Sequence, residues 1–186
     1  LRLFVSQILD YGFFHADPHA GNILVKKDGK VVFIDFGAVG KIQPNDKEIL
    51  ENLIVSFVAK NPHKIVRYLK KMAVSYEIPD EKRFENDVEE VLNFVHSSSL
   101  QDINVQVIIN KMKDILKENR LYMPDYFYLL FKGISLIEGV GRNINPDLDI
   151  VKSLNPYTRK IFTNKINPKN ILKTGVDRMM NFTDNV

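Results

Sequence analysis

The segment at residues 13–40 constrains the fold most strongly, because polar side chains there alternate with short apolar runs. The runs NILV and VVFID within it are rich in β-branched residues and are joined by KKDGK. The pair Asp28 and Gly29 in that linker is a strong signal for a tight hairpin turn. We therefore expect a two-stranded hairpin that follows a polar loop and brings Asp35, at the end of its second strand, back toward Asn22.

Helical periodicity is present before residues 13–40 and in almost all of the sequence after them. Apolar residues recur at spacings of three and four, and Pro44, Asn61, Pro62, Asp80 and Pro124 are typical of helix starts. The expected helices cover residues 1–11, 44–60, 62–74, 80–96, 104–119 and 124–140, with two more beginning at 155–156 and 167–168. The sequence therefore predicts a mostly α-helical fold with a small β-hairpin.

The composition is that of a globular protein with one hydrophobic core: 186 residues, 45% hydrophobic and 26% charged. The absence of cysteine excludes disulfides, thiolate zinc sites and a cysteine nucleophile. The net charge of +3 is too small to indicate a nucleic-acid partner, so none is expected. Residues 152–186 carry seven Lys or Arg against two Asp, and this basic end favours an anionic surface as a partner.

The polar segment holds four side chains of interest among residues typical of a core: His15, Asp17, Asn22 and Asp35. Magnesium prefers hard oxygen ligands together with phosphate and water, and phosphoryl transfer also needs a carboxylate that orients the attacking group. Asp17 as the base, with Asn22 and Asp35 on the metal, is therefore a coherent assignment. The spacing agrees with the protein-kinase catalytic loop, H-R-D-x-x-x-x-N followed by D-F-G, because HADPHAGN begins at His15 and DFG begins at Asp35.

The sequences GFFHADPHAGNILV and VVFIDFGAVGKI resemble the ABC1/ADCK/UbiB family of atypical kinase-like proteins, whose loop typically reads HADPHPGN. Ala20 takes the place of that proline, a difference expected to affect the rigidity of the loop more than its chemistry. NPHKIVRYLKKM and LIEGVGRNINPDLDI resemble later segments of the same family. The resemblance covers most of residues 1–155 and implies a protein-kinase-like C-terminal lobe there, followed by a basic helical extension over residues 156–186.

The resemblance implies Mg²⁺ and ATP as cofactors, ATPase or unorthodox kinase activity, and a link to ubiquinone (coenzyme Q) or related isoprenoid-lipid metabolism. By position, Asp17 is the catalytic residue, and Asn22 and Asp35 bind the metal and the nucleotide. Structural roles fall to the remaining motif residues, His15, Phe36 and Gly37. An isoprenoid lipid and an anionic membrane surface are further candidate partners. The implied location is the bacterial cytoplasm or membrane periphery, or a mitochondrion or plastid.

The resemblance also implies an N-terminal lobe that covers the nucleotide, with a KxGQ motif, a loop rich in small residues, and a strand lysine paired to a helix glutamate. Neither a KxGQ motif nor a G-x-G-x-x-G loop occurs in these 186 residues. We therefore expect a truncated protein of the family, whose chain alone binds ATP very weakly and does not turn it over.

Other functions fit the same residues. A small-molecule phosphotransferase of the aminoglycoside or choline kinase type has a loop of the form H-G-D-x-x-x-x-N with a later I-D-[FW]. Ala16, the complete DFG and the EGV helix argue against that type. A non-catalytic pseudokinase or lipid-binding scaffold fits the lack of nucleotide-covering motifs. A His/Asp metal centre at His19 is a further alternative, although His63 and His96 lie far away in the sequence.

Three patterns later in the chain have both a structural and a functional interpretation. Glu138 and Arg142 are four residues apart, which favours a structural ion pair. The aromatic cluster FYLLF, at residues 127–131, is expected in the core, with an isoprenoid-binding groove as the alternative. The last predicted helix, at residues 170–182, is expected to dock on the domain, with contact to an anionic membrane as the alternative.

Overall fold

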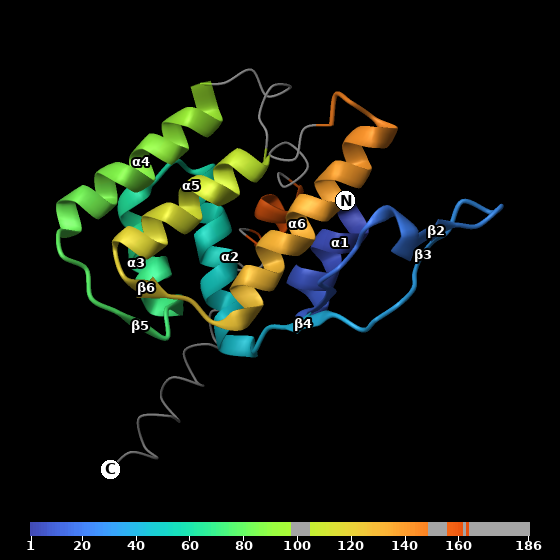
Figure 1. Cartoon of the computed structure of the whole chain (residues 1–186), viewed down its shortest axis with the longest axis horizontal. Coiled ribbons are helices and arrows are strands. Elements are labelled where there is room, and N and C mark those ends of the chain that lie inside the picture. Colours follow the sequence, from blue (N-terminus) through green and yellow to red (C-terminus); the bar gives the residue numbers. More distant parts are fainter. Residues whose placement is uncertain (98–104, 149–155, 162, 164–186) are drawn as a thin grey trace, which may run out of the picture.

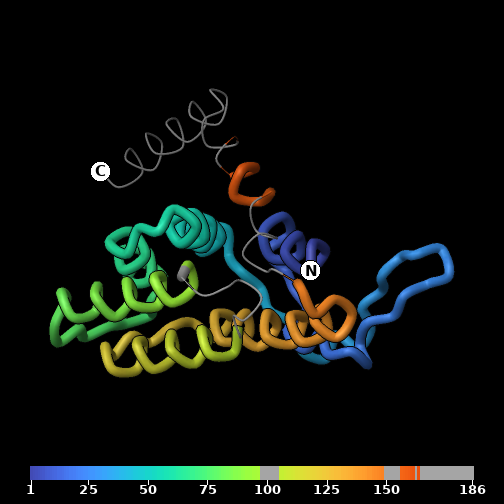
Figure 2. The backbone as a smooth tube through the Cα atoms, turned by 90° about the horizontal axis from the view of Figure 1, so that it is seen from above, coloured from blue at the N-terminus to red at the C-terminus, as the bar shows by residue number. Residues whose placement is uncertain are grey.

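The computed structural model describes residues 1–97, 105–148, 156–161 and 163. Its α-helices are α1 (Arg2–Ser6), α2 (Pro44–Val58), α3 (Pro62–Met72), α4 (Glu81–Ser97), α5 (Val105–Glu118) and α6 (Asp125–Ile144). Its strands are β1 (Phe13–His15), β2 (Ile23–Val25), β3 (Val31–Phe33), β4 (Val39–Lys41), β5 (Ser75–Tyr76) and β6 (Leu121–Tyr122). The helices form one body, and the β2–β3 hairpin extends away from it (Figures 1 and 2). This architecture confirms the predicted mostly helical fold class.

The N-terminal helix carries apolar residues at helical spacing, and its buried side chains include Phe4 and Ile8. α1 continues into a π-helical turn, η1 (Gln7–Tyr11), and the chain leaves the helix at Gly12, whose φ of +65° is left-handed. Glycine adopts that conformation without steric cost, so it ends the helix where the sequence indicated. The helix predicted over residues 1–11 is confirmed.

The predicted hairpin is present, since β2 and β3 pair antiparallel with Ile23 opposite Phe33. The amide of Ile34 extends this ladder by donating to the carbonyl oxygen of Asn22 over 3.0 Å. The second strand ends earlier than expected, because Asp35 has a φ of +57° and a left-handed residue cannot continue a β-ladder. Asp35 therefore lies in the turn after β3 rather than at the end of the strand.

Two further strand pairs were not predicted: β1 with β4, and β5 with β6. Each of these strands has three residues or fewer, which is too short to show an alternating pattern. In the β1–β4 pair Phe14 lies opposite Gly40, and a Cβ added at Gly40 would lie 2.1 Å from Cζ of Phe14. The pair therefore needs a glycine at that position, and it joins the two ends of the segment that contains the polar loop and the hairpin.

α6 is the central helix of the body, as its apolar sequence predicted. It runs between α5 and α1 in Figure 1 and contacts α5 and β4. Its buried residues include Phe127, Leu130 and Ile137, which join one core cluster with residues of α1, α3 and α4. The core position predicted for the FYLLF cluster is confirmed for Phe127 and Leu130, whereas Tyr128 is exposed.

α6 also carries the predicted ion pair between Glu138 and Arg142. Glu138 is a buried residue, and a buried carboxylate needs such a partner to offset its loss of hydration. Although α6 is largely apolar, neither it nor any other helix in the described part of the chain is long and apolar enough to cross a membrane.

The starts of α3 and α4 are marked by the side chains that the sequence indicated. Asn61 accepts a hydrogen bond from the amide of Lys64 over 2.9 Å, and Asp80 accepts one from the amide of Arg83 over 3.0 Å. These bonds satisfy amides that have no partner inside the helix. α3 and α4 therefore begin where the sequence predicted.

Residues 156–161 form a helix, which confirms the helix predicted there. It is attached to the N-terminal helix. The hydroxyl of Tyr157 donates to the carbonyl oxygen of Arg2 over 2.7 Å, and Lys160 forms an ion pair with Asp10 at 2.7 Å. The last predicted helix, with its docking and membrane alternatives, lies outside the described residues.

Candidate active site

His15 is the centre of the polar segment, because it has no exposed surface and both of its ring nitrogens bind the backbone. The amide of Asp17 donates to Nδ1 over 3.1 Å, so Nδ1 carries no proton. Nε2 holds the proton of the neutral ring and donates to the carbonyl oxygen of Ile34 over 2.9 Å. One imidazole thus joins the loop that holds Asp17 to the segment that leads into Asp35.

The loop between β1 and β2 is shaped by its own side chains. His19 caps the short 3₁₀-helix η2 (Ala20–Asn22) by accepting a hydrogen bond from the amide of Gly21 over 3.0 Å. Asn22 is buried, and its Nδ2 donates to the carbonyl oxygen of Asp17 over 3.1 Å. Because Nδ2 is used in this bond, Oδ1 is the atom of Asn22 that could bind a cation.

The ladder bond places Ile34 opposite Asn22, and Asp35 is the next residue in the chain. Its side chain is exposed, and Oδ1 accepts a hydrogen bond from the amide of Gly37 over 3.3 Å. Asp17, Asn22 and Asp35 therefore come from two segments that the buried imidazole and the ladder bond hold together.

The other two DFG residues lie against the same groups. The ring of Phe36 packs on the imidazole of His15 with centroids 5.1 Å apart, and Phe33 lies 5.7 Å from it on β3. A Cβ added at Gly37 would lie 3.2 Å from Oδ1 of Asp35. A side chain at position 37 would therefore crowd the carboxylate that the motif presents.

Ala16 occupies the position at which the protein-kinase loop has an arginine. It is fully buried, and its amide donates to the carbonyl oxygen of Ala38 over 3.0 Å. An arginine there would have to place its guanidinium in the core, which is costly without a paired charge. Burial therefore explains this difference between the loop and the protein-kinase pattern.

The structure adds a residue that sequence reasoning missed. Nζ of Lys132, on α6, lies 3.1 Å from Oδ1 of Asp17, and the two side chains are 51% and 35% exposed. The sequence does mark Lys132 as unusual, because it is the only Lys or Arg in α6 before Arg142. Lys132 and Asp17 are far apart in the sequence, so only the fold shows that they meet.

The donor chemistry of Asn22 and Asp35 fits Mg²⁺ bound to a phosphate group. An amide oxygen and a carboxylate are hard ligands, and magnesium at phosphate sites takes one or two protein ligands and completes its shell with phosphate and water. Among the described residues, no cluster of three or more His, Cys, Asp or Glu could hold a metal ion alone. The described part of the chain therefore offers no support for a His/Asp metal centre at His19.

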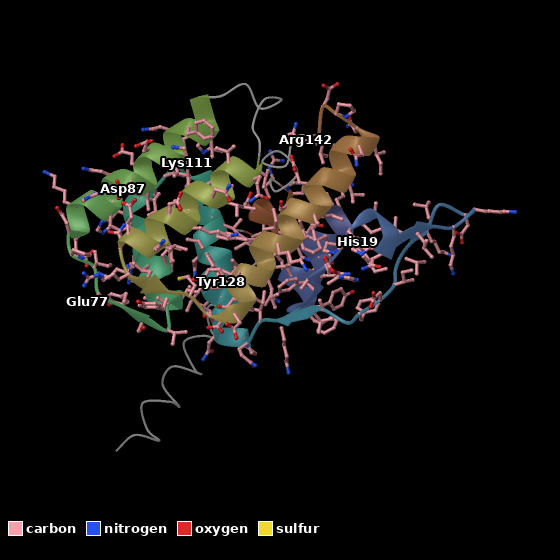
Figure 3. All side chains as sticks on the ribbon, in the orientation of Figure 1. His19, Glu77, Asp87, Lys111, Tyr128 and Arg142 are labelled. Atoms are coloured by element: carbon pink, nitrogen blue, oxygen red, sulfur yellow. The ribbon has the colours of Figure 1, made fainter. Side chains whose placement is uncertain are left out.

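The histidines that lie far from His19 in the sequence, His63 and His96, have their own contacts in the fold. His63 lies 3.4 Å from a carboxylate oxygen of Glu85, and the ring of His96 packs 6.0 Å from that of Phe57. Figure 3 shows His19 on the side where the hairpin leaves the body, whereas the α4 residue Asp87 lies at the opposite end. The candidate site is therefore confined to the β-hairpin end of the molecule.

Two family models match the chain. The model of the ABC1 atypical kinase-like domain matches residues 1–69, which include the loop, the hairpin and Asp35. The model of the UbiB helical domain matches residues 88–149, which include α5, α6 and therefore Lys132. The ion pair between Lys132 and Asp17 thus joins the two matched regions.

Curated relatives match most of this chain but only part of their own length. The uncharacterized protein sll1770 of Synechocystis sp. is 29% identical over 164 residues, 88% of this chain and 28% of that protein. The uncharacterized protein in the hydrogenase 1 5′ region of Clostridium pasteurianum is 30% identical over 156 residues, 84% of this chain and 29% of that protein. A second Synechocystis protein, sll0005, is 28% identical over 84% of this chain. The chain spans 23% to 34% of the length of these and similar curated relatives.

Proposed function

The chain belongs to the ABC1/UbiB family of atypical kinase-like proteins, and from this premise we propose that it supplies the catalytic loop and metal ligands of an ATP-dependent phosphotransfer enzyme. The reaction moves the γ-phosphoryl group of Mg-ATP to water or to a hydroxyl group. One observation carries the proposal: the buried imidazole of His15 binds both the amide of Asp17 and the segment that precedes Asp35. The two carboxylates that the reaction needs are thus held by one structural unit.

Each residue of this unit has a role that follows from its position. Asp17 is partly exposed, so its carboxylate is able to accept the hydrogen bond of the attacking hydroxyl group or water and to orient it. Asn22, through Oδ1, and Asp35, through its carboxylate, hold the cation. When bound, Mg²⁺ neutralises charge on the phosphate oxygens. His15 keeps the loop and the DFG segment in register while this occurs.

The physiological reaction and the place where it occurs are proposed from the family. The physiological reaction is tied to ubiquinone or related isoprenoid-lipid metabolism, and the kinase-like lobe over residues 1–155 carries the catalysis. The basic extension over residues 156–186 favours binding at the surface of an anionic membrane. Each Lys or Arg near such a surface adds to the attraction between the protein and the anionic lipids.

ATP turnover by the full gene product that carries this chain tests the proposal. We expect Asp17→Asn to lower kcat by about 10²–10⁴-fold, because that range is typical of a lost general base. We expect Asp35→Asn to raise the Mg²⁺ concentration needed for half-maximal turnover. Asparagine tolerates the left-handed backbone at position 35 but lacks the charge that attracts the cation. Asp114→Asn, at an exposed position of α5, is the matched control and should leave both quantities unchanged.

The competing functions give different outcomes in the same assay. A non-catalytic scaffold predicts that Asp17→Asn and the wild type behave alike, and that result would overturn the catalytic assignment. A small-molecule phosphotransferase predicts turnover that depends on an added hydroxyl-bearing acceptor. Turnover that does not depend on Mg²⁺ would contradict the role given to Asn22 and Asp35.

A further inference from the structure

Lys132 of α6 places an ammonium group beside the loop carboxylate of the candidate site, with Nζ 3.1 Å from Oδ1 of Asp17. The two residues come from different matched regions, since Asp17 lies in residues 1–69 and Lys132 in residues 88–149. An ion pair between side chains this exposed contributes little to folding stability. Stability alone therefore gives no reason for a lysine in the most apolar helix of the body.

Gly133, the residue after Lys132, explains how α6 approaches the loop so closely. Gly133 is buried, and a Cβ added there would lie 2.7 Å from Cζ of Phe4 and 3.4 Å from the carbonyl oxygen of His15. The helix backbone thus lies almost against the backbone of β1. This contact places the adjacent side chain of Lys132 at the start of the loop that His15 anchors.

The loop itself contains no Lys or Arg that could pair with its own carboxylate. The four residues between Asp17 and Asn22 are Pro, His, Ala and Gly, and the position before Asp17 is Ala16. Within α6 the other basic residue, Arg142, pairs with Glu138. The positive charge next to Asp17 therefore comes from Lys132, across the boundary between the two matched regions.

We propose that Lys132 is a positioning residue of the candidate site, which holds the carboxylate of Asp17 in one orientation. In this arrangement the UbiB helical region does not merely pack against the kinase-like region, because it completes the site there. The inference rests on the proposed function, since it assigns Lys132 to the reaction in which Asp17 orients the attacking group. Lys132 acts through Asp17 and is not itself assigned to the substrate.

The first experiment needs no nucleotide and uses the 186-residue chain. The ¹³C shift of the Asp17 carboxyl carbon is measured by NMR at one neutral pH in the wild type and in three variants. We expect Lys132→Met to move this signal, Lys132→Arg to restore most of the difference, and the exposed α5 control Lys113→Met to leave it unchanged. An Asp17 signal that is the same in Lys132→Met and in the wild type would show that the pair does not hold the carboxylate.

The second experiment measures ATP turnover by the full gene product. We expect Lys132→Met to lower kcat by about tenfold to a hundredfold, because small errors in the orientation of a catalytic group have effects of that size. The KM for ATP should change by less than about threefold, since Asp17 does not hold the nucleotide, and Lys132→Arg should recover most of kcat. Lys113→Met is again the control.

The Asp35→Asn variant separates a failure of this inference from a failure of the proposed function. If Asp35→Asn impairs turnover and Lys132→Met does not, the proposed function stands and the role of Lys132 is wrong. If neither variant impairs turnover, the proposed function itself fails. A loss of kcat in Lys132→Met that Lys132→Arg does not restore, together with a lower melting temperature, would show that Lys132 has only a structural role.

Discussion

Nε2 of His15 donates a hydrogen bond to the carbonyl oxygen of Ile34 over 2.9 Å, across nineteen positions of sequence. The same ring accepts the amide of Asp17 at Nδ1, so the imidazole is neutral and has one defined tautomer. A charged ring would carry protons on both nitrogens and could not accept the Asp17 amide. The neutral ring is therefore a structural requirement of the loop that presents Asp17.

Replacement of this histidine should destabilise the fold. His15→Phe keeps a ring in the core but leaves the Asp17 amide and the Ile34 carbonyl group without their partner. Each unpaired buried polar group costs about 1–3 kcal/mol, so for the two together we expect a loss of about 2–6 kcal/mol in the free energy of unfolding. Urea denaturation followed by circular dichroism measures it. The control is His63→Phe, whose parent side chain is 79% exposed, and its change should be within about 0.5 kcal/mol. Equal changes in the two variants would contradict the structural role of His15.

The elements that sequence reasoning found are those whose signals are local. The hairpin with its Asp28 and Gly29 turn, the caps at Asn61 and Asp80, and the left-handed end at Gly12 each depend on a few adjacent residues. Local hydrogen bonds and backbone preferences decide such features, so the sequence shows them directly.

The elements that it missed depend on distant parts of the chain. The three-residue strands β1 and β4 are too short to show a pattern, and they form because Phe14 packs over Gly40. The ion pair between Asp17 and Lys132 requires the packing of α6 on the N-terminal segment. The roles of Asp17, Asn22 and Asp35 stay predictions, because their spacing indicates chemistry but only an assay measures it.

Ala20→Pro should stabilise the loop. Ala20 is exposed and is the first residue of η2, a position at which proline is tolerated because the amide needs no partner in the helix. The preceding residue, His19, already has φ −71° and ψ 165°, which is the conformation required before proline. We expect a gain of about 0.4–1 kcal/mol from the lower entropy of the unfolded chain. Urea denaturation of Ala20→Pro beside Ala20→Ser tests it, and a loss of stability in the proline variant alone would contradict the loop geometry.

The ion pair between Asp10 and Lys160 should make stability depend on pH. Hydrogen bonds from Lys160 and Ser6 hold the pKa of Asp10 below its usual value, and the bond to Asp10 raises the pKa of Lys160. The Asp10 contribution is therefore present above the unfolded pKa of about 4 and is lost as the pH falls through the lower folded value. The Lys160 contribution is present below its unfolded pKa of about 10.4 and is lost as the pH rises through the higher folded value.

The measurement compares melting temperatures of the wild type and Asp10→Asn across this range. We expect the wild type to be more stable between about pH 5 and pH 9, with the difference disappearing at the acid end. The difference should also be smaller at 1 M salt, because salt weakens the attraction between exposed charges. Asp114→Asn is the control for the loss of one exposed carboxylate. If the melting temperatures of the wild type and Asp10→Asn differ by the same amount above and below the pKa of Asp10, the pair does not form.

Two glycines of α6 give a matched test of how closely this helix approaches the loop. A Cβ at Gly133 would lie 2.7 Å from Cζ of Phe4, whereas a Cβ at Gly139 meets no atom within 4 Å. Gly133→Ala should therefore lower stability by about 1–3 kcal/mol, the usual range for overpacking a core. Gly139→Ala should raise stability by up to about 1 kcal/mol, because alanine is the better helix former. If both variants change stability in the same direction, α6 does not rest against Phe4, and the route by which Lys132 reaches Asp17 is wrong.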